Sequence, residues 1–120
     1  MCGIAGFVTE QGAQADPALA RAMCGRMLHR GPDGYGHFEE GPVALGHLRL
    51  SIIDIEGGWQ PIGNEDGRLQ VIFNGEIYNY LEVRSELESS GHLFKTHSDT
   101  EVLVHLYEDL GERMVERLNG

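Results

Sequence analysis

The segment VALGHLRLSIID, residues 43–54, limits most strongly how this chain can fold. It is rich in β-branched and apolar residues, and turn-forming pairs bound it on both sides, Gly41-Pro42 before it and Gly57-Gly58 after it. An apolar run of this length between turn residues predicts a β-strand. The fold must therefore contain a sheet that buries at least one face of this segment.

Further strands and helices are predicted from the same kinds of signal. GIAGFVT (3–9) predicts a small-residue strand, and RLQVIFNGEIYNY (68–80) predicts a second strong strand that breaks near Asn74-Gly75. DPALARAMCGRMLHRG (16–31) predicts a helix. Between this helix and the main strand, PDGYG (32–36) predicts a turn.

The helix boundaries come from capping residues. Asp16 is the predicted N-cap with Pro17 at the first helical position, and Gly31 is the predicted stop. Three later segments also predict helix: LEVRSELESSGH (81–92), which ends at Gly91, HSDTEVLVHLYEDLG (97–111), which begins with a Ser/Asp cap, and ERMVERLNG, which is helical up to Leu118. Three or four strands and three helices, not counting the final segment ERMVERLNG, predict the α+β class.

Composition excludes several functions. The chain has 120 residues, which suggests one small domain or a piece of a larger one. A net charge of -10 disfavours nucleic acid and anionic membrane surfaces, which need clustered Lys and Arg. No apolar run approaches the length that spans a membrane, and no signal peptide precedes Cys2. We therefore expect a cytoplasmic protein that binds neither nucleic acid nor membrane.

The two cysteines, Cys2 and Cys24, invite different interpretations. Cys24 is interpreted as a buried, small apolar residue on the predicted helix. Cys2 follows the initiator Met1, whose removal would place a thiol and a free α-amine on one residue. The amine, with a reference pKa near 8, can then act as the base for the thiol. The alternative is that Cys2 is an ordinary residue of an N-terminal strand.

Other polar residues also admit a structural and a functional interpretation. Asn74-Gly75 can form a hairpin turn, or an oxyanion hole made of the Asn amide and the Gly N–H. Arg49 can face water, or bind a carboxylate with its planar guanidinium. Glu76 and Asp99 can be surface acids, with Asp99 a helix cap, or can bind a cationic amine. Together the functional interpretations describe a pocket for a free amino acid.

No metal site or nucleotide site is predicted. The six histidines fit no zinc spacing, and Cys24 has no second cysteine at CxxC distance. Gly-rich phosphate-binding motifs are absent from the sequence. We therefore expect this chain to bind no metal and no cofactor.

Taken in order, six motifs resemble one family. MCGIAGF, HRGPDGYG, HLRLSIID, QPI, FNGEIYNY and HSDTEV are similar to the glutaminase domain of class II glutamine amidotransferases, and most similar to the branch of glutamine-hydrolysing asparagine synthetases. The resemblance covers nearly the whole chain, residues 2–120. It implies an N-terminal-nucleophile hydrolase fold, an αββα sandwich of two antiparallel sheets between helical layers.

The resemblance also implies a role for each candidate residue. Cys2 would be the nucleophile and its α-amine the base, while Asn74 and Gly75 would form the oxyanion hole. Substrate-binding roles for L-glutamine would fall to Asn74 and to four further residues, with Arg49 at the α-carboxylate, Glu76 and Asp99 at the α-amine, and the Ile53 backbone nearby.

The resemblance further implies that residues 1–120 are the N-terminal part of a glutaminase domain, without its C-terminal remainder. The synthetase domain of the parent protein, which would need ATP and Mg, is also outside this chain. We expect the missing strands to leave apolar edges exposed, which favours a homodimer or strand exchange. The parent would make asparagine from aspartate. The alternatives are that it amidates another carboxylate, such as a cell-envelope sugar acid, or that the fragment is inactive and serves only binding or assembly.

Overall fold

The protein is α+β with antiparallel sheets, as the sequence predicts. A computed structural model describes residues 2–50 and 58–120. These residues form two compact units, and each is described on its own. The N-terminal unit holds residues 2–50, 59–61 and 72–74, and the C-terminal unit holds residues 58, 62–71 and 75–120. Among the residues described, no helix has the length and apolar character needed to cross a bilayer.

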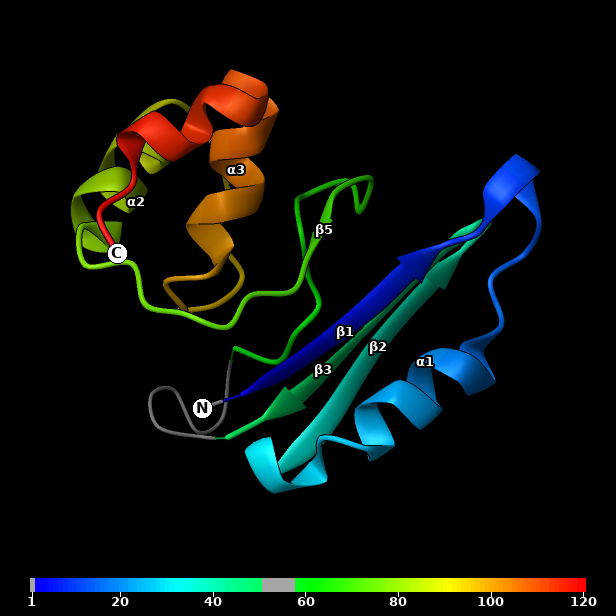
Figure 1. Cartoon of the computed structure of the whole chain (residues 1–120). Helices are drawn as coiled ribbons and strands as arrows, with labels where there is room; N and C mark the ends of the chain where they lie inside the picture. Colours follow the sequence, from blue (N-terminus) through cyan, green and yellow to red (C-terminus); the bar gives the residue numbers. More distant parts are fainter. Residues whose placement is uncertain (1, 51–57) are drawn as a thin grey trace. The chain divides into compact units, whose positions relative to one another are not determined.

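A three-stranded antiparallel sheet forms the centre of the N-terminal unit (Figure 1). Its order is β1-β3-β2, with β1 at Gly3–Val8, β2 at Gly34–Glu40 and β3 at Val43–Arg49. Strands β1 and β3 confirm the strands predicted at residues 3–9 and 43–54. The prediction that the turn extends to residue 36 is wrong, because the chain enters β2 at Gly34, which pairs with Arg49 of β3.

Helix α1, Pro17–Gly25, packs on this sheet. The predicted N-cap is confirmed, because the Asp16 carboxylate accepts a hydrogen bond from Ala18 N–H at 2.9 Å. The predicted end at Gly31 is wrong. The Arg26 N–H turns back to the carbonyls of Met23 and Cys24, and a 3-10 turn at Leu28–Arg30 follows.

Cys24 is buried beneath the sheet, as predicted. Its side chain is 1% exposed, and burial raises the pKa of the thiol. A Cβ atom placed on Gly46 of β3 would lie 2.5 Å from Cys24 Sγ. Glycine at position 46 therefore lets the helix approach the sheet closely.

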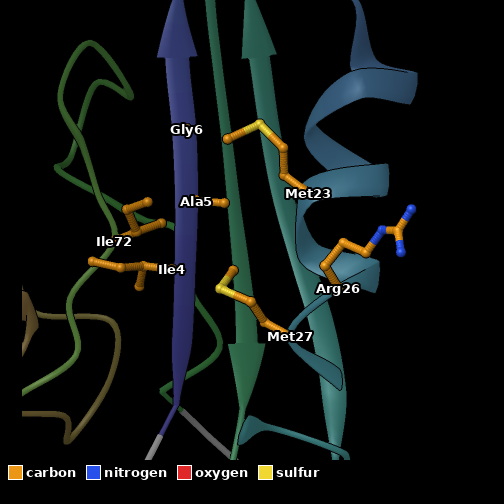
Figure 2. Close-up of a pocket in the computed structure, with 7 residues that line it drawn as sticks. All are labelled: Ile4, Ala5, Gly6, Met23, Arg26, Met27 and Ile72. Atoms are coloured by element: carbon orange, nitrogen blue, oxygen red, sulfur yellow. The ribbon is translucent and has the colours of Figure 1, made fainter. Parts of the chain in front are cut away.

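An open pocket of about 570 Å³ lies beside β1 in the same unit (Figure 2). Ile4 and Ile72 line one side, and Met23 of α1 and Met27, just after that helix, line the other with their sulfur atoms toward the strands. Apart from Arg26 the lining is apolar, and it includes none of the predicted catalytic residues. We therefore assign it to packing of the sheet and not to the glutamine site.

The C-terminal unit consists of a short hairpin and helices. Strands β4, Ile62–Gly63, and β5, Gln70–Val71, pair antiparallel, and two α-helices follow, α2 at Tyr80–Ser89 and α3 at Glu101–Leu110. A 3-10 helix, η3 at Gly111–Arg117, follows α3 directly, so the predicted final helix is present in a tighter form.

The long strand predicted at residues 68–80 is wrong, because only Gln70–Val71 pair as a strand. Backbone N–H groups after β5 find other partners. Phe73 N–H donates to Gln60 Oε1 at 2.5 Å, Ile77 N–H to Asp99 Oδ2 at 2.9 Å, and Tyr78 N–H to the Asn119 carbonyl at 2.7 Å. These hydrogen bonds satisfy the backbone N–H groups of Phe73, Ile77 and Tyr78 without a neighbouring strand.

Candidate functional site

Cys2 immediately precedes β1 and lies beside the end of β3. Leu50 N–H donates to Cys2 Sγ at 3.3 Å, and the Cys2 carbonyl accepts a hydrogen bond from Arg30 Nε at 3.2 Å. The sulfur is half-buried and forms no disulfide. The thiol in turn donates to the Leu50 carbonyl at 3.7 Å, so both backbone groups of Leu50 hold the sulfur beside the end of β3.

Arg49 is the last residue of β3 and is 4% exposed, so the interpretation that it faces water is wrong. Its guanidinium lies over the Trp59 ring, 5.0 Å from the centroid. The ring has room because Gly34 lacks a side chain, since a Cβ there would lie 2.3 Å from the Trp59 ring. The glycine of the RGPDG motif therefore helps to position the arginine through the tryptophan.

His47 lies two residues before Arg49 on β3 and is also buried. Burial, and secondarily the positive charge of Arg49, lower the pKa of His47 to about 4. The imidazole is therefore neutral at neutral pH. The positive charge at the end of β3 is carried by the Arg49 guanidinium, whose planar shape has the geometry to bind a carboxylate.

Asn74, Gly75 and Glu76 lie in the exposed segment between β5 and α2. The hairpin interpretation of Asn74-Gly75 is wrong, because no strand follows these residues before α2. Among the described residues, hairpins are formed instead by β2 and β3, joined at residues 41–42, and by β4 and β5, joined by residues 64–69. An exposed Asn-Gly pair outside a hairpin is free to present the Asn amide to a ligand.

Asp99 lies just before α3, but its side chain does not cap the helix. The N-cap position is Thr100, whose N–H donates to Ser98 Oγ at 3.2 Å. Asp99 Oδ2 instead accepts from Ile77 N–H at 2.9 Å. The carboxylate of Asp99 is thereby tied to the residue next to Glu76, and the two acids belong to adjoining segments of the C-terminal unit.

The predicted site residues are shared between the two units. Cys2, Arg49 and Asn74 belong to the N-terminal unit, where Cys2 and Arg49 lie at neighbouring ends of β1 and β3. Gly75, Glu76 and Asp99 belong to the C-terminal unit. The predictions for Met1 and Ile53 lie outside the described residues.

Sequence reasoning missed the Leu50 N–H beside the thiol and Trp59 beside Arg49. Gly34, which leaves room for the Trp59 ring, was the sequence signal for the position of Trp59. It also missed a group of two histidines and two glutamates in the C-terminal unit, Glu65, His92, His105 and Glu108, whose side chains converge. A zinc motif is recognised by ligands at set spacings along one segment. The members of this group come from three separate segments, so no such spacing could reveal them.

Comparison with known proteins places the chain in a family. All of it, residues 1–120, matches the model of the glutamine amidotransferase domain. It is 46% identical over 123 residues to asparagine synthetase [glutamine-hydrolyzing] 1 of Bacillus subtilis (strain 168), a match that covers 100% of this chain and 20% of the relative. It is 42% identical over 122 residues to a probable asparagine synthetase [glutamine-hydrolyzing] of Dictyostelium discoideum, covering 100% of this chain and 22% of the relative.

An asparagine synthetase [glutamine-hydrolyzing] of Triphysaria versicolor is 44% identical over 121 residues, which again cover 100% of this chain and 20% of the relative. The chain spans about a fifth of the length of these curated relatives. The match over its full length confirms the resemblance carried by the six motifs: the chain belongs to the glutamine amidotransferase domain family.

Proposed function

We propose that this chain hydrolyses the side-chain amide of L-glutamine to glutamate and ammonia, with Cys2 as the nucleophile. The observation that carries the proposal is the position of Cys2 at the end of β1, with Leu50 N–H on its sulfur and buried Arg49 at the end of the neighbouring strand. A nucleophile and a carboxylate-binding cation are thereby held on rigid strands, which fixes their geometry.

The catalytic steps follow from these groups. Removal of Met1 frees the Cys2 amine, which accepts the thiol proton. The thiolate attacks the amide carbon, and the oxyanion that forms is held by the Asn74 amide and Gly75 N–H. The amine returns the proton to the departing nitrogen, so that ammonia leaves and a thioester remains. Water then attacks the thioester, releasing glutamate and restoring the thiol.

Substrate binding is assigned to the charged residues. Arg49 binds the α-carboxylate of glutamine, while Glu76, Asp99 and the Ile53 backbone bind its α-amine. The Asp99 contact with Ile77 N–H supports this assignment, because it orients the carboxylate and fixes the segment that carries Glu76. Buried Arg49 supports it further, since a desolvated guanidinium binds a carboxylate more strongly than an exposed one does.

The finer fold and the whole protein's activity are part of the same proposal. We infer the αββα sandwich of N-terminal-nucleophile hydrolases, which is supported by a nucleophile that leads directly into a strand of an antiparallel sheet covered by α1. The names of the relatives support a whole protein that passes ammonia to aspartate. ATP and Mg would serve that step outside this chain.

The test compares the two cysteines in the full-length protein and in this chain. Glutamate release from glutamine is measured for Cys2→Ala and for Cys24→Ala, the matched control beneath the sheet. We expect Cys2→Ala to abolish release while Cys24→Ala keeps most of it. Activity retained by Cys2→Ala would refute the nucleophile, and intact mass reports whether Met1 is removed.

The oxyanion role has its own test. Asn74→Ala should lower kcat roughly a hundredfold, or about 3 kcal/mol of barrier, and change KM much less. The substitution is at an exposed position, so folding should be preserved. An unchanged kcat would remove Asn74 from the mechanism while leaving Cys2 in place.

A further inference from the structure

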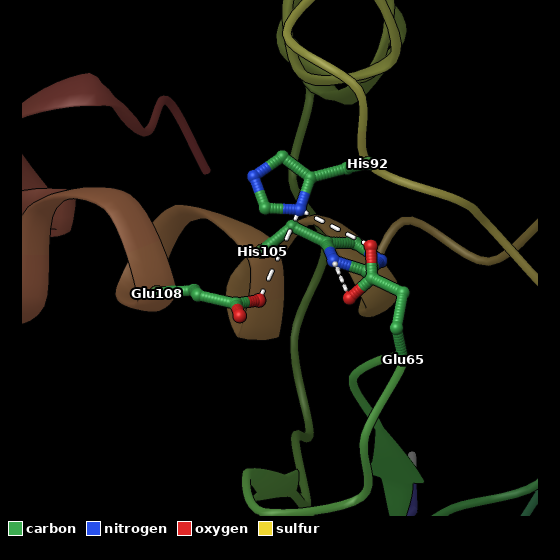
Figure 3. Close-up of side chains that lie close together, drawn as sticks. All are labelled: Glu65, His92, His105 and Glu108. Carbon is green, nitrogen blue, oxygen red and sulfur yellow. Dashed lines mark hydrogen bonds and ion pairs between the residues drawn. The ribbon is translucent and has the colours of Figure 1, made fainter.

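Four side chains outside the proposed glutamine site converge in the C-terminal unit (Figure 3). Glu65 comes from the turn between β4 and β5, His92 from the loop after α2, and His105 and Glu108 from successive turns of α3. One potential ligand atom from each side chain can be chosen so that all four atoms lie within 4.8 Å of one another. Three separate segments therefore direct nitrogen and oxygen atoms at one point.

The distances between these atoms suit a small cation. His92 Nδ1 is 3.2 Å from Glu65 Oε1 and 3.9 Å from Glu108 Oε2, and His105 Nδ1 is 3.2 Å from Glu65 Oε2. Ligands bound tetrahedrally at about 2.1 Å from a zinc ion lie about 3.4 Å apart. The cluster needs only small side-chain movements to reach that arrangement.

The opposite nitrogen of each ring faces a carboxylate. His92 Nε2 is 3.2 Å from Asp109 Oδ1, and His105 Nε2 is 3.6 Å from Oε1 of the fully buried Glu101. A carboxylate there favours the tautomer with its proton on Nε2, which leaves the Nδ1 lone pair directed at the centre. Histidines that bind metals characteristically carry such an outer carboxylate.

The glutamates are held as well. Leu93 N–H donates to Glu65 Oε1 at 2.9 Å, and Asn64 Nδ2 donates to Glu108 Oε2 at 3.4 Å. Outer hydrogen bonds of this kind orient carboxylate ligands. All four side chains thus have supporting contacts that fix their direction.

His105 supplies independent evidence for a missing partner. Its side chain is 1% exposed, and neither ring nitrogen makes a hydrogen bond of normal geometry. A buried polar group in that condition requires an explanation, of which an unseen ion is one. The centroids of the His92 and His105 rings lie 4.8 Å apart, so a single ion can contact both rings.

We propose that Glu65, His92, His105 and Glu108 bind one divalent transition-metal ion, Zn²⁺ in the first instance. Two imidazole nitrogens favour Zn²⁺ over Mg²⁺ or Ca²⁺, which prefer oxygen ligands alone. Four protein ligands leave no open position, which is typical of a structural site. The ion ties the β4–β5 turn and the loop after α2 to α3, and the site is separate from the proposed chemistry at Cys2.

The test titrates Zn²⁺ into the EDTA-treated, dialysed chain by calorimetry, with Co²⁺ as a spectroscopic probe. We expect one Zn²⁺ per chain, a Kd of roughly micromolar or tighter, and visible Co²⁺ absorption of tetrahedral type. Glu108→Gln should weaken Zn²⁺ binding roughly a hundredfold, as loss of a ligand does. The matched control is Glu82→Gln, an exposed glutamate on α2 that should leave binding unchanged.

Thermal unfolding distinguishes a metal site from a hydrogen-bond network. Zn²⁺ should raise Tm of the wild type and of Glu82→Gln, and should lose that effect in Glu108→Gln and His92→Gln. If Zn²⁺ does not bind, or if Glu108→Gln binds it as tightly as the wild type does, the proposal is wrong. Glu108 is exposed on α3, so its variant remains folded enough to decide the question. None of these readouts depends on glutaminase activity.

Discussion

The two units of this chain each bury a histidine close to a formally charged side chain, but the charges have opposite signs. In the N-terminal unit, buried His47 lies on the same strand as buried Arg49. In the C-terminal unit, buried His105 faces buried Glu101 at 3.6 Å. The same residue type is therefore placed in a positive field in one unit and in a negative field in the other.

The difference indicates what each region can bind. Burial and then Arg49 hold the pKa of His47 at about 4, so the positive charge there belongs to Arg49 and attracts an anion. Burial alone would raise the pKa of Glu101, but the nearby His105 ring and hydrogen bonds from Lys95 and Thr96 lower it to about 2. The second region therefore keeps its negative charge and attracts a cation.

The largest expected effect is in the C-terminal unit, on removal of the Glu101 carboxylate. Its oxygens accept from Lys95 N–H at 2.7 Å, from Thr96 N–H at 2.7 Å and from the Thr96 hydroxyl at 2.6 Å. Glu101→Ala leaves these donors without their partner and should lower the free energy of unfolding by about 4 kcal/mol. Urea denaturation measures it. A loss no larger than that of Glu82→Ala would show that the buried charge contributes little.

The next effect is a pH dependence that belongs to the N-terminal unit. Because the folded pKa of His47 is about 4 and its ordinary value is 6.5, the unfolded state binds a proton first as pH falls. The contribution of His47 to stability is fully present above pH 6.5 and should decrease by roughly 3 kcal/mol as pH falls toward 4. The low pKa values of Glu65 and Glu101 add losses only below about pH 4.5.

His47→Gln should remove most of this slope between pH 6.5 and 5, while His29→Gln, at an exposed histidine of the same unit, should keep it. Denaturation midpoints across that range measure the difference. An identical slope in the two variants would assign the pH dependence to other groups.

A smaller effect is expected when the side chain at position 49 keeps its positive charge but is no longer a planar guanidinium. Arg49→Lys removes the planar guanidinium that stacks on Trp59 and can bind a carboxylate through two hydrogen bonds. KM for glutamine should rise roughly tenfold, with a smaller change in kcat. Steady-state kinetics measure both, with Arg68→Lys at an exposed arginine as the control. Equal KM values would mean that only the charge of Arg49 matters.

The smallest effect concerns the start of α1. Asp16→Ala removes the hydrogen bond to Ala18 N–H and should lower stability by about 1 kcal/mol. Ser98→Ala removes the acceptor for Thr100 N–H at the start of α3 and allows the two units to be compared directly. Denaturation curves report both. No loss for Asp16→Ala would show that Pro17 alone fixes the helix start.

Sequence signals within a short segment predicted the structural features that depend on that segment alone. Asp16-Pro17 located the start of α1, and the apolar pattern of residues 43–49 located β3. Strand β2 was not predicted as a strand, because glycines at positions 34 and 36 are typical of a turn. In the fold, Trp59 and Gln60 occupy the space that these two glycines leave. That information lies in a distant segment.

The site was predicted unequally for the same reason. The motif residues were identified, but the burial of Arg49 and the Leu50 N–H beside the thiol depend on strand pairing. The strand expected at residues 68–80 ended early because side chains and a distant carbonyl replaced a neighbouring strand as partners. Glu65, His92 and His105 converge only through tertiary folding, which no spacing rule along one segment describes.

The packing of Cys24 against Gly46 has a practical consequence for chemical labelling. Of the two cysteine sulfur atoms in this chain, one is enclosed between α1 and β3, where burial raises the pKa of the thiol, and the other is half-buried at the start of β1. An alkylating reagent should therefore modify a single position in the folded chain, at Cys2. Counting modified molecules by mass would then give the fraction of chains with a reactive Cys2 thiol directly, without any mutation.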